Sequence, residues 1–175
     1  GGVGADALAT DRLQADVVEG SANLFAFNQA NGYERTLLHK RDGQFQDRKG
    51  TINSNLQATQ INIEADRYHL TSVFNNLIDN AIKYCKDIPQ ITISSVNRDG
   101  GCVVEVTDNG IGISQEHQKR VFKKFYRVPT GNVHDVKGFG LGLSYAKTVI
   151  EAHGGEISLK SELGKGCSFR IYIPG

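Results

Sequence analysis

The sequence predicts an α/β fold, a two-layer α/β sandwich in which a mixed, mostly antiparallel sheet carries helices on one face. Apolar residues alternate with polar ones in short segments, such as 61–63 and 91–93, and gather in a short run at 102–106, as is typical of strands. A helical period of apolar residues runs through 70–82 and again through 143–150. Strands and helices neither alternate strictly nor segregate along the chain, which favours this mixed arrangement.

The first 43 residues carry weak signals, because Gly20 and Gly32 interrupt an apolar pattern with helical spacing. We interpret residues 1–43 as a linker, as added terminal residues or as the first elements of the domain, and these interpretations stay open. Residues 44–175 are assigned to one domain, a length that allows a sizeable core.

The sharper signals begin with Phe45, Ile52 and Leu56 around residues 49–50, which suggest two short strands and a turn. Asp66 then predicts the N-cap of a long helix. The apolar face of this helix holds the i, i+3, i+4, i+7 pattern for more than three turns. Its residues are Leu70, Val73, Phe74, Leu77, Ile78, Ala81 and Ile82.

Two antiparallel strands are expected next, at 91–93 and 102–106, with a turn at 99–101. A glycine-rich turn follows at 108–112. Ser114 is a candidate cap for a helix that carries Val121, Phe122 and Phe125.

Residues 127–137 are polar and irregular. Alternate glycines at 138–142 then lead into a helix over 143–150, which the glycine pair 154–155 ends. A final hairpin is expected between 157 and 173.

The composition excludes several classes of function. Lys and Arg number 20 against 19 Asp and Glu, so nothing indicates nucleic acid or a direct contact with an anionic membrane. The three cysteines, Cys85, Cys102 and Cys167, are odd in number and far apart, which favours reduced thiols over a disulfide framework or a zinc site. No apolar run approaches the length that spans a bilayer.

Asn76, Asn80 and Lys83 fall on one flank of the long predicted helix. Two amide oxygens one turn apart suit a Mg²⁺ ion that keeps other positions for phosphate and water, and Lys83 adds a positive charge for the phosphates. The alternative is an ordinary solvated helix face.

Asp108 is expected on the same strand face as Val104 and Val106, next to a glycine turn. A carboxylate there can accept a hydrogen bond from the exocyclic amine of adenine, and Gly110 and Gly112 leave room for a flat ring. The alternative is a tight turn without further function.

The segment 137–142 (KGFGLG) runs into a helix, where exposed backbone amides and the helix dipole favour an anion. It lacks the Gly-Lys-Ser/Thr of a Walker A loop and follows no predicted strand, which argues against a Rossmann turn. A flexible hinge is the alternative.

In this order the segments resemble the conserved boxes of the Bergerat-fold ATPases, which include gyrase, Hsp90, MutL proteins and histidine kinases. The match is most similar to histidine kinases. The segments that carry it are NLIDNAIKY at 76–84 (N box), DNGIGI at 108–113 (G1 box), FKKFYR at 122–127 (F box) and GFGLGLS at 138–144 (G2 box). The resemblance covers the chain from about residue 44 to its end, and it implies the ATP-binding catalytic domain of a sensor histidine kinase.

This resemblance implies a role for each matching residue. Asn80 would be the main Mg²⁺ ligand and Asn76 a supporting metal or phosphate contact. Lys83 and Tyr84 would touch phosphates and ribose, and Asp108 would bind the adenine amine. Asn76 and Lys83 would be the catalytic residues for transfer of the γ-phosphate.

The resemblance also implies a mobile lid at 127–141, with Arg127 and Lys137 as its phosphate-binding cations. Phe125 would anchor the base of this lid together with Phe122, although a core role for both is an equal alternative. Ser168 would hold a water beside Asp108. The remaining ATP contacts would come from Gly110, Gly112, Gly138, Gly140, Leu141 and Gly142.

Hydrolysing members of the superfamily have a glutamate, the general base for water, where this chain has Asn76. Asn76 cannot accept a proton, so the resemblance favours transfer to a better nucleophile over hydrolysis. None of the five histidines precedes an acidic residue and a proline as the acceptor histidine does in complete kinases. We therefore expect the acceptor on a dimerisation domain outside this chain.

The implied partners are this histidine-bearing domain and a response regulator, and the implied location is a cytoplasmic domain of a parent protein often anchored in the inner membrane. Three alternatives stay open: a degenerate nucleotide-binding module, an ATP-driven clamp of the same superfamily, and a serine kinase. The sensed signal does not follow from the sequence.

Overall fold

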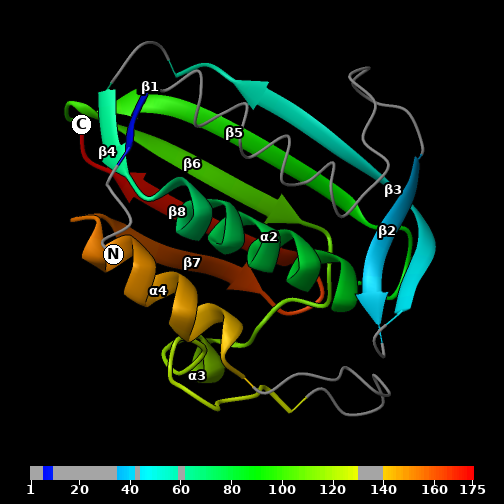
Figure 1. Cartoon of the computed structure of the whole chain (residues 1–175). Coiled ribbons are helices and arrows are strands. Elements are labelled where there is room, and N and C mark those ends of the chain that lie inside the picture. Colours follow the sequence, from blue (N-terminus) through cyan, green and yellow to red (C-terminus); the bar gives the residue numbers. More distant parts are fainter. Residues whose placement is uncertain (1–5, 10–34, 42–43, 59–61, 130–139) are drawn as a thin grey trace.

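The computed structural model describes residues 6–9, 35–41, 44–58, 62–129 and 140–175. These residues form the two predicted layers, with helices α2 and α4 side by side across one face of the main sheet (Figure 1). The strands of that sheet are β2 (Arg35–Arg41), β3 (Gln44–Leu56), β5 (Gln90–Arg98), β6 (Gly101–Asp108), β7 (Glu156–Glu162) and β8 (Gly166–Ile173). The helices are α2 (Arg67–Lys83), α3 (Gln115–Gln118) and α4 (Gly142–Ala152). A separate pair joins β1 (Asp6–Ala9) to β4 (Asn62–Ala65) in antiparallel register.

The main sheet is mixed and mostly antiparallel, which confirms the predicted fold class. Its order is β2-β3-β5-β6-β8-β7, and among the described strands only β3 and β5 run parallel. The prediction of two strands and a turn around residues 49–50 is wrong, because β3 is continuous there. Its first half pairs with β2 and its second half with β5, so two partners in succession keep the backbone extended.

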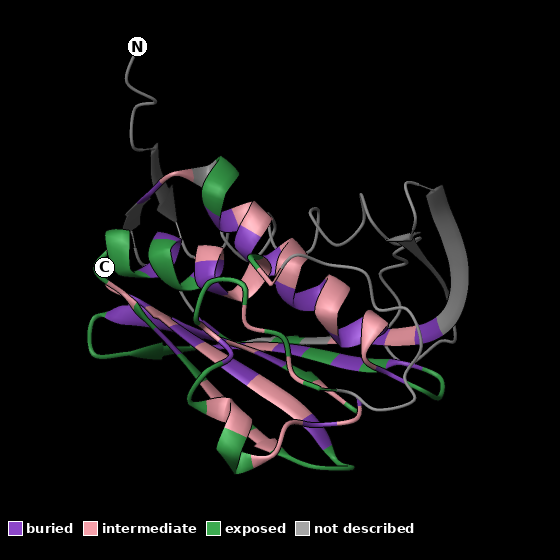
Figure 2. Ribbon diagram, turned by 90° about the horizontal axis from the view of Figure 1, so that it is seen from below, coloured by how far each residue is buried: buried purple, intermediate pink, exposed green. Residues whose placement is uncertain are grey.

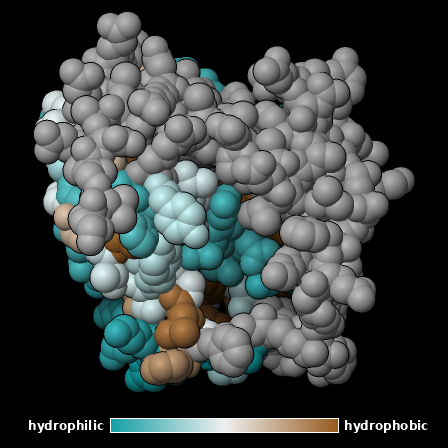
Figure 3. Space-filling model, viewed as in Figure 1, coloured by the Kyte–Doolittle hydropathy of each residue, from teal (hydrophilic) through white to brown (hydrophobic). Residues whose placement is uncertain are grey.

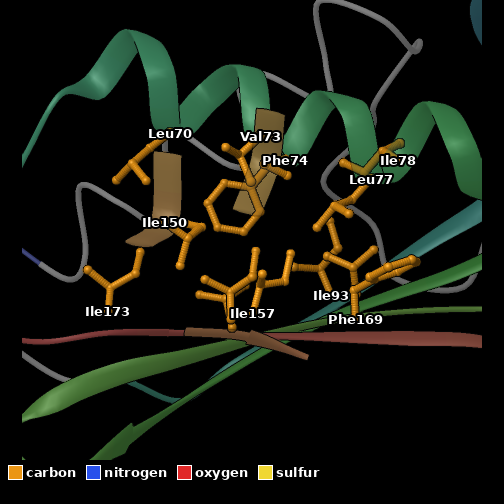
Figure 4. Close-up of a cluster of buried hydrophobic side chains, with 14 of the residues drawn as sticks. Leu70, Val73, Phe74, Leu77, Ile78, Ile93, Ile150, Ile157, Phe169 and Ile173 are labelled. Carbon is orange, nitrogen blue, oxygen red and sulfur yellow. The ribbon is translucent and has the colours of Figure 1, made fainter. Parts of the chain in front are cut away.

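Helix α2 begins at the predicted cap, since the Asp66 side chain accepts a hydrogen bond from the amide of His69 at 3.1 Å. Its predicted apolar face is buried against the sheet, and Figure 4 shows these side chains meeting residues of the strands and of α4. Figure 2 shows the same burial as a buried stripe between the two layers. Each large side chain buried in this way contributes about 1.5–3 kcal/mol relative to an exposed one.

The predicted helix after Ser114 is shorter than expected. Helix α3 ends at Gln118, and the Ser114 side chain makes no capping hydrogen bond. The chain then runs through tight turns, each closed by an amide that donates to the carbonyl three residues earlier: Arg120 to His117, Lys123 to Arg120 and Tyr126 to Lys123. Phe125, within the last of these turns, has φ +63°, which lies outside the right-handed helical region and so prevents the turns from continuing as an α-helix.

Helices α2 and α4 are joined at one end by a histidine. The amide of Asp66 donates to Nε2 of His153 at 2.9 Å, and Nδ1 of His153 lies 2.7 Å from the carbonyl oxygen of Val149. The glycine pair 154–155 ends α4 as predicted, with Gly154 at φ +73°. None of the described helices is long and apolar enough to cross a membrane.

Candidate nucleotide site

A cavity of about 330 Å³ opens between the C-terminal half of α2, the N-terminal end of α4 and the turn that follows β6. In the space-filling view of this face of the molecule (Figure 3), brown apolar atoms gather in the lower part of the face, next to the N-terminal end of α4. The size of the cavity is within the range of small-molecule sites. It brings together residues from all three segments that the sequence analysis singled out.

The polar flank of α2 forms one side of the cavity through Asn76, Asp79, Asn80, Lys83 and Tyr84. Lys83 is paired within this flank, because its Nζ lies 2.7 Å from Oδ2 of Asp79. Asp79 belongs to the motif but was given no role from the sequence. Its i, i+4 spacing from Lys83 was the signal that it would share the site.

Asp108 ends β6 and lines the cavity near the C-terminal end of α2, since a Cβ on Gly110 would lie 2.9 Å both from its Oδ1 and from the carbonyl oxygen of Tyr84. Its Oδ1 accepts hydrogen bonds from the amide of Gly110 at 2.8 Å and the amide of Cys167 at 3.1 Å. Burial raises the pKa of this carboxyl above its usual value, and the two amide hydrogen bonds oppose the shift. Because Oδ1 is occupied by the backbone, Oδ2 is the oxygen left to accept a hydrogen bond from a ligand.

The turn after Asp108 is held on both sides. The amide of Ile111 donates to the carbonyl of Tyr84 at 2.9 Å, and the amide of Gly164 donates to the carbonyl of Ile111 at 2.7 Å. Gly112 has φ +71°, and a Cβ there would lie 2.1 Å from the carbonyl oxygen of Glu162. The turn therefore needs glycine at 112 in order to pack against the β7–β8 hairpin.

Asn109 fixes the same turn to the start of β5. Its Oδ1 accepts from the amide of Gln90 at 2.8 Å, and its Nδ2 donates to the carbonyl of Ile88 at 3.1 Å. The side chain thus satisfies backbone groups on a separate loop, which is a structural role that the sequence reasoning did not assign.

The N-terminal end of α4 faces the polar flank of α2. Gly140, Leu141 and Gly142 all line the cavity, and a Cβ on Gly142 would lie 3.8 Å from Cγ of Asn76. The first amides of a helix have no acceptor within it, so this end offers donors and a partial positive charge to an anion.

The other predicted site residues lie in the segment between α3 and α4. Arg127 lines the cavity. Phe125 does not line it: the residue is 72% exposed, and its amide donates to the carbonyl of Gly140 at 3.0 Å. Lys137 and Gly138 lie outside the described residues.

Ser168 is not brought into the cavity. It lies on the opposite face of the sheet, where its Oγ donates to Glu105 at 2.7 Å and shares a hydrogen bond with Thr107 at 2.9 Å. The residue of β8 beside Asp108 is Cys167, which lines the cavity. Gly110 likewise does not line it, but is buried behind Asp108, where a Cβ would lie 2.9 Å from Oδ1.

Apolar side chains form much of the wall, and the sequence reasoning assigned none of them to the site. They are Ile111, Ile113, Val121, Val128, Leu143 and Phe169, together with the aromatic ring of Tyr126. An apolar cleft with one carboxylate at its end suits a flat base that carries an amine.

The opposite end suits phosphates and a magnesium ion. Amide oxygens on Asn76 and Asn80 and the carboxylate of Asp79 are hard oxygen donors of the type that Mg²⁺ prefers. The described residues hold no cluster of three or more His, Cys, Asp or Glu that could hold a metal by themselves. This donor set fits an ion that completes its shell with phosphate and water.

Comparison with known proteins gives a consistent result. Residues 65–175 match the family model described as "Histidine kinase-, DNA gyrase B-, and HSP90-like ATPase". The sensor protein RprX of Bacteroides fragilis is 50% identical over 127 residues, which are 71% of this chain and 24% of that protein. The chain thus spans about a quarter of the length of this relative.

Two solved structures share the architecture. The catalytic domain of the histidine kinase ThkA aligns with a TM-score of 0.58 at 29% identity, over 70% of this chain and 80% of that one. The mycobacterial sensor histidine kinase MprB aligns with a TM-score of 0.64 over 98% of this chain and 97% of that one, and its 20% identity shows the common fold. With the boxes and the cavity in place, this chain belongs to the family of histidine kinase-, DNA gyrase B- and HSP90-like ATPases, as an ATP-binding catalytic domain of the sensor histidine kinase type.

Proposed function

We propose that this domain binds Mg–ATP in the cavity between α2, α4 and the turn after β6, and transfers the γ-phosphate to a histidine on a dimerisation domain outside the chain. The observation that carries the proposal is the polarity of the cavity. A half-buried carboxylate, Asp108, lies beside the C-terminal end of α2, and Asn76, nearer the middle of that helix, faces the start of α4, with Asn80 between them along α2.

The adenine end follows from the hydrogen bonds of Asp108. Two backbone amides hold Oδ1, which restricts rotation of the carboxylate and leaves Oδ2 to accept a hydrogen bond from the ligand. An ionised carboxylate only accepts hydrogen bonds, and it therefore selects a base with an exocyclic amine over one with a carbonyl at the same position. Adenine meets this requirement, and its faces fit the apolar walls.

The phosphate end combines three kinds of positive charge. Lys83 and Arg127 line the cavity, and the first amides of α4 add the helix dipole. Asn80, with Asn76 in support, would hold a Mg²⁺ ion, which supplies charge neutralisation for the phosphates. Lys83 already pairs with Asp79, so it is held on the correct flank of α2.

Phosphoryl transfer requires positioning and charge stabilisation more than covalent participation by the protein. Asn76 faces Gly142 at the start of α4, the place where the phosphates would lie, and its amide cannot take a proton from water. Water is therefore poorly activated in this site. This favours an external nucleophile such as a neutral imidazole.

The partners that we propose are the histidine-bearing domain of the same parent protein and a response regulator that receives the phosphate. The name of the RprX relative as a sensor protein supports a role in signalling. We place the domain in the cytoplasm, where ATP is available, and leave open whether the parent protein is anchored in the inner membrane.

The proposal is tested by incubating the chain with Mg²⁺ and γ-labelled ATP, alone and with the dimerisation domain of its parent protein. We expect no label on the chain alone and an acid-labile, base-stable phosphate on the added domain. An acid-stable phosphate would instead identify a serine kinase. Rapid release of free phosphate without any labelled protein would identify an ATPase, and either result would overturn the histidine kinase proposal.

A further inference from the structure

The side chain of Tyr126 joins the wall of the nucleotide cavity to a residue outside it. Tyr126 lines the cavity, and its hydroxyl is hydrogen-bonded to Nδ1 of His117 on α3. The two rings lie 6.1 Å apart between centroids and are tilted by 37°. His117 itself does not line the cavity.

The backbone between these two residues is closed into a compact loop. Three successive turns connect them, each with a hydrogen bond from an amide to the carbonyl three residues earlier. The bond between the His117 and Tyr126 side chains then joins the first turn to the last. Such a loop fixes where the ring of Tyr126 points, provided that α3 itself is anchored.

Gln118 provides this anchor. Its Nε2 donates to the carbonyl of Ile113 at 2.7 Å and to the carbonyl of Ser161 on β7 at 2.9 Å. Ser161 in turn accepts from the amide of Ile113 at 2.8 Å. Helix α3 is thus fastened both to the turn that follows Asp108 and to the last hairpin of the sheet.

The other side of Tyr126 adjoins the start of α4. A Cβ on Gly140 would lie 2.9 Å from the carbonyl oxygen of Tyr126, and the amide of Phe125 donates to the carbonyl of Gly140. Tyr126 therefore stands between the anchored α3 and the helix end that faces the phosphates. A displacement of its ring would change the cavity wall beside that end.

We propose that His117 is a positioning residue for nucleotide binding, which holds the Tyr126 ring in the cavity wall through their hydrogen bond. This inference rests on the proposed nucleotide site. The ring of Tyr126 contacts the nucleotide, and His117 acts only through that ring.

The fold contains a matched control pair. Nδ1 of His69 lies 2.7 Å from the hydroxyl of Tyr145, again with ring centroids 6.1 Å apart. This pair joins α2 to α4, and neither residue lines the cavity. Tyr145→Phe thus removes a histidine–tyrosine hydrogen bond of the same kind without touching the proposed site.

The experiment measures the dissociation constant of Mg–ADP by calorimetry, together with the thermal unfolding midpoint, for a set of variants of the whole chain. We expect Tyr126→Phe and His117→Ala each to weaken binding by about two- to tenfold, the value of one neutral hydrogen bond. The double variant Tyr126→Phe/His117→Ala should bind Mg–ADP no more weakly than whichever single variant binds it more weakly, because both changes break the same hydrogen bond. His117→Asn, which keeps a polar atom near the position of Nδ1, should restore most of the affinity.

Tyr145→Phe should lower the thermal unfolding midpoint about as much as Tyr126→Phe does, because each change removes one histidine–tyrosine hydrogen bond. It should leave nucleotide affinity within about twofold of the unmodified chain. The inference is overturned if Tyr126→Phe weakens binding and His117→Ala does not, since the hydroxyl would then act without His117. It is also overturned if the two losses multiply, or if Tyr145→Phe weakens binding equally. If the unmodified chain binds no Mg–ADP, the proposed nucleotide site itself is wrong, a result distinct from all of these.

Discussion

The backbone amide of Cys167 donates to Oδ1 of Asp108 across 3.1 Å, so the last hairpin holds the carboxylate at the end of the cavity. The two residues are 59 positions apart in the chain. The hydrogen bond leaves the orientation of Asp108 independent of any ligand. A preformed acceptor of this kind binds without the entropy cost of ordering a mobile side chain.

Replacing Asp108 by asparagine is therefore expected to remove adenine recognition. The amide oxygen can keep the two backbone hydrogen bonds, but the amide nitrogen then occupies the ligand side and meets the adenine amine as donor against donor. We expect ADP affinity to fall by about tenfold or more, the value of a hydrogen bond to a charged group. Calorimetry of Asp108→Asn beside Asp99→Asn, whose side chain is 80% exposed, would check this. Equal affinity in Asp108→Asn and the unmodified chain would contradict the proposed adenine contact.

The same substitution is expected to stabilise the empty domain at neutral pH. Burial raises the folded-state pKa of Asp108, so the folded state binds its proton more tightly than the unfolded chain does, and the ionised form destabilises the fold. This cost to stability is fully present at pH values above the folded-state pKa of Asp108. It disappears as pH falls through that pKa and on to the lower pKa of the unfolded chain. Asp108→Asn, which has no charge, should show a higher free energy of unfolding than the unmodified chain at neutral pH.

The measurement is urea unfolding of both proteins at pH values stepped from neutral down to about 4. The difference in free energy of unfolding between Asp108→Asn and the unmodified chain should become smaller as pH falls. A difference that stays constant or widens would show that the charge of Asp108 is not the cause.

Asn80→Ala is expected to separate metal binding from base binding. The change removes one proposed Mg²⁺ ligand and leaves the Asp108 end intact, so affinity for ADP should fall by about tenfold or more with Mg²⁺ present. In a metal chelator the affinity of the variant and of the unmodified chain should agree. Asn55→Ala, an exposed asparagine that accepts only from Gln57 in the described contacts, is the control. An equal loss with and without Mg²⁺ would contradict the metal role of Asn80.

The fold could be predicted from the sequence where the spacing of apolar residues along the chain matches the side chains that are buried in the structure. The apolar residues of α2, the alternation in β5 and β8 and the apolar run of β6 reappear as the buried core. The cap at Asp66 and the glycine pair at 154–155 were also predictable, because the chemistry of a helix end is local.

The wrong predictions came from contacts that are distant in sequence. Residues 49–50 look like a turn, but β2 and β5 each pair with half of β3 and keep it straight. Ser168 was assigned to the site where the structure places Cys167. Since side chains alternate between the faces of a strand, an error of one position moves a residue to the wrong side of the sheet.

The cavity residues show the same division. Asn76, Asn80 and Lys83 share a helix flank, and that relationship follows from their spacing. Tyr126 and Phe169 reach the cavity through tertiary packing, and no local period indicates that they do. Phe125 is exposed and has a left-handed backbone, and the sequence alone revealed neither.

The turn after Asp108 is expected to tolerate alanine poorly at Gly112. Gly100 and Gly112 have nearly the same backbone, with φ +74° and +71°, so alanine meets the same conformational cost of about 1–2 kcal/mol at either position. At Gly100 no atom lies within 4 Å of the added Cβ, whereas at Gly112 the carbonyl oxygen of Glu162 lies at 2.1 Å. Gly112→Ala should therefore lose about 1–3 kcal/mol more than Gly100→Ala in urea unfolding.

Because Gly112 also lines the cavity, the shift that accommodates its Cβ should reach the nucleotide site. We expect Gly112→Ala to weaken ADP binding under conditions in which it remains folded, and Gly100→Ala to bind like the unmodified chain. Equal losses of stability in Gly112→Ala and Gly100→Ala would mean that the β7–β8 hairpin moves away from the added Cβ at little cost. The close packing of residue 112 against Glu162 would then not be what holds the adenine end of the cavity in place.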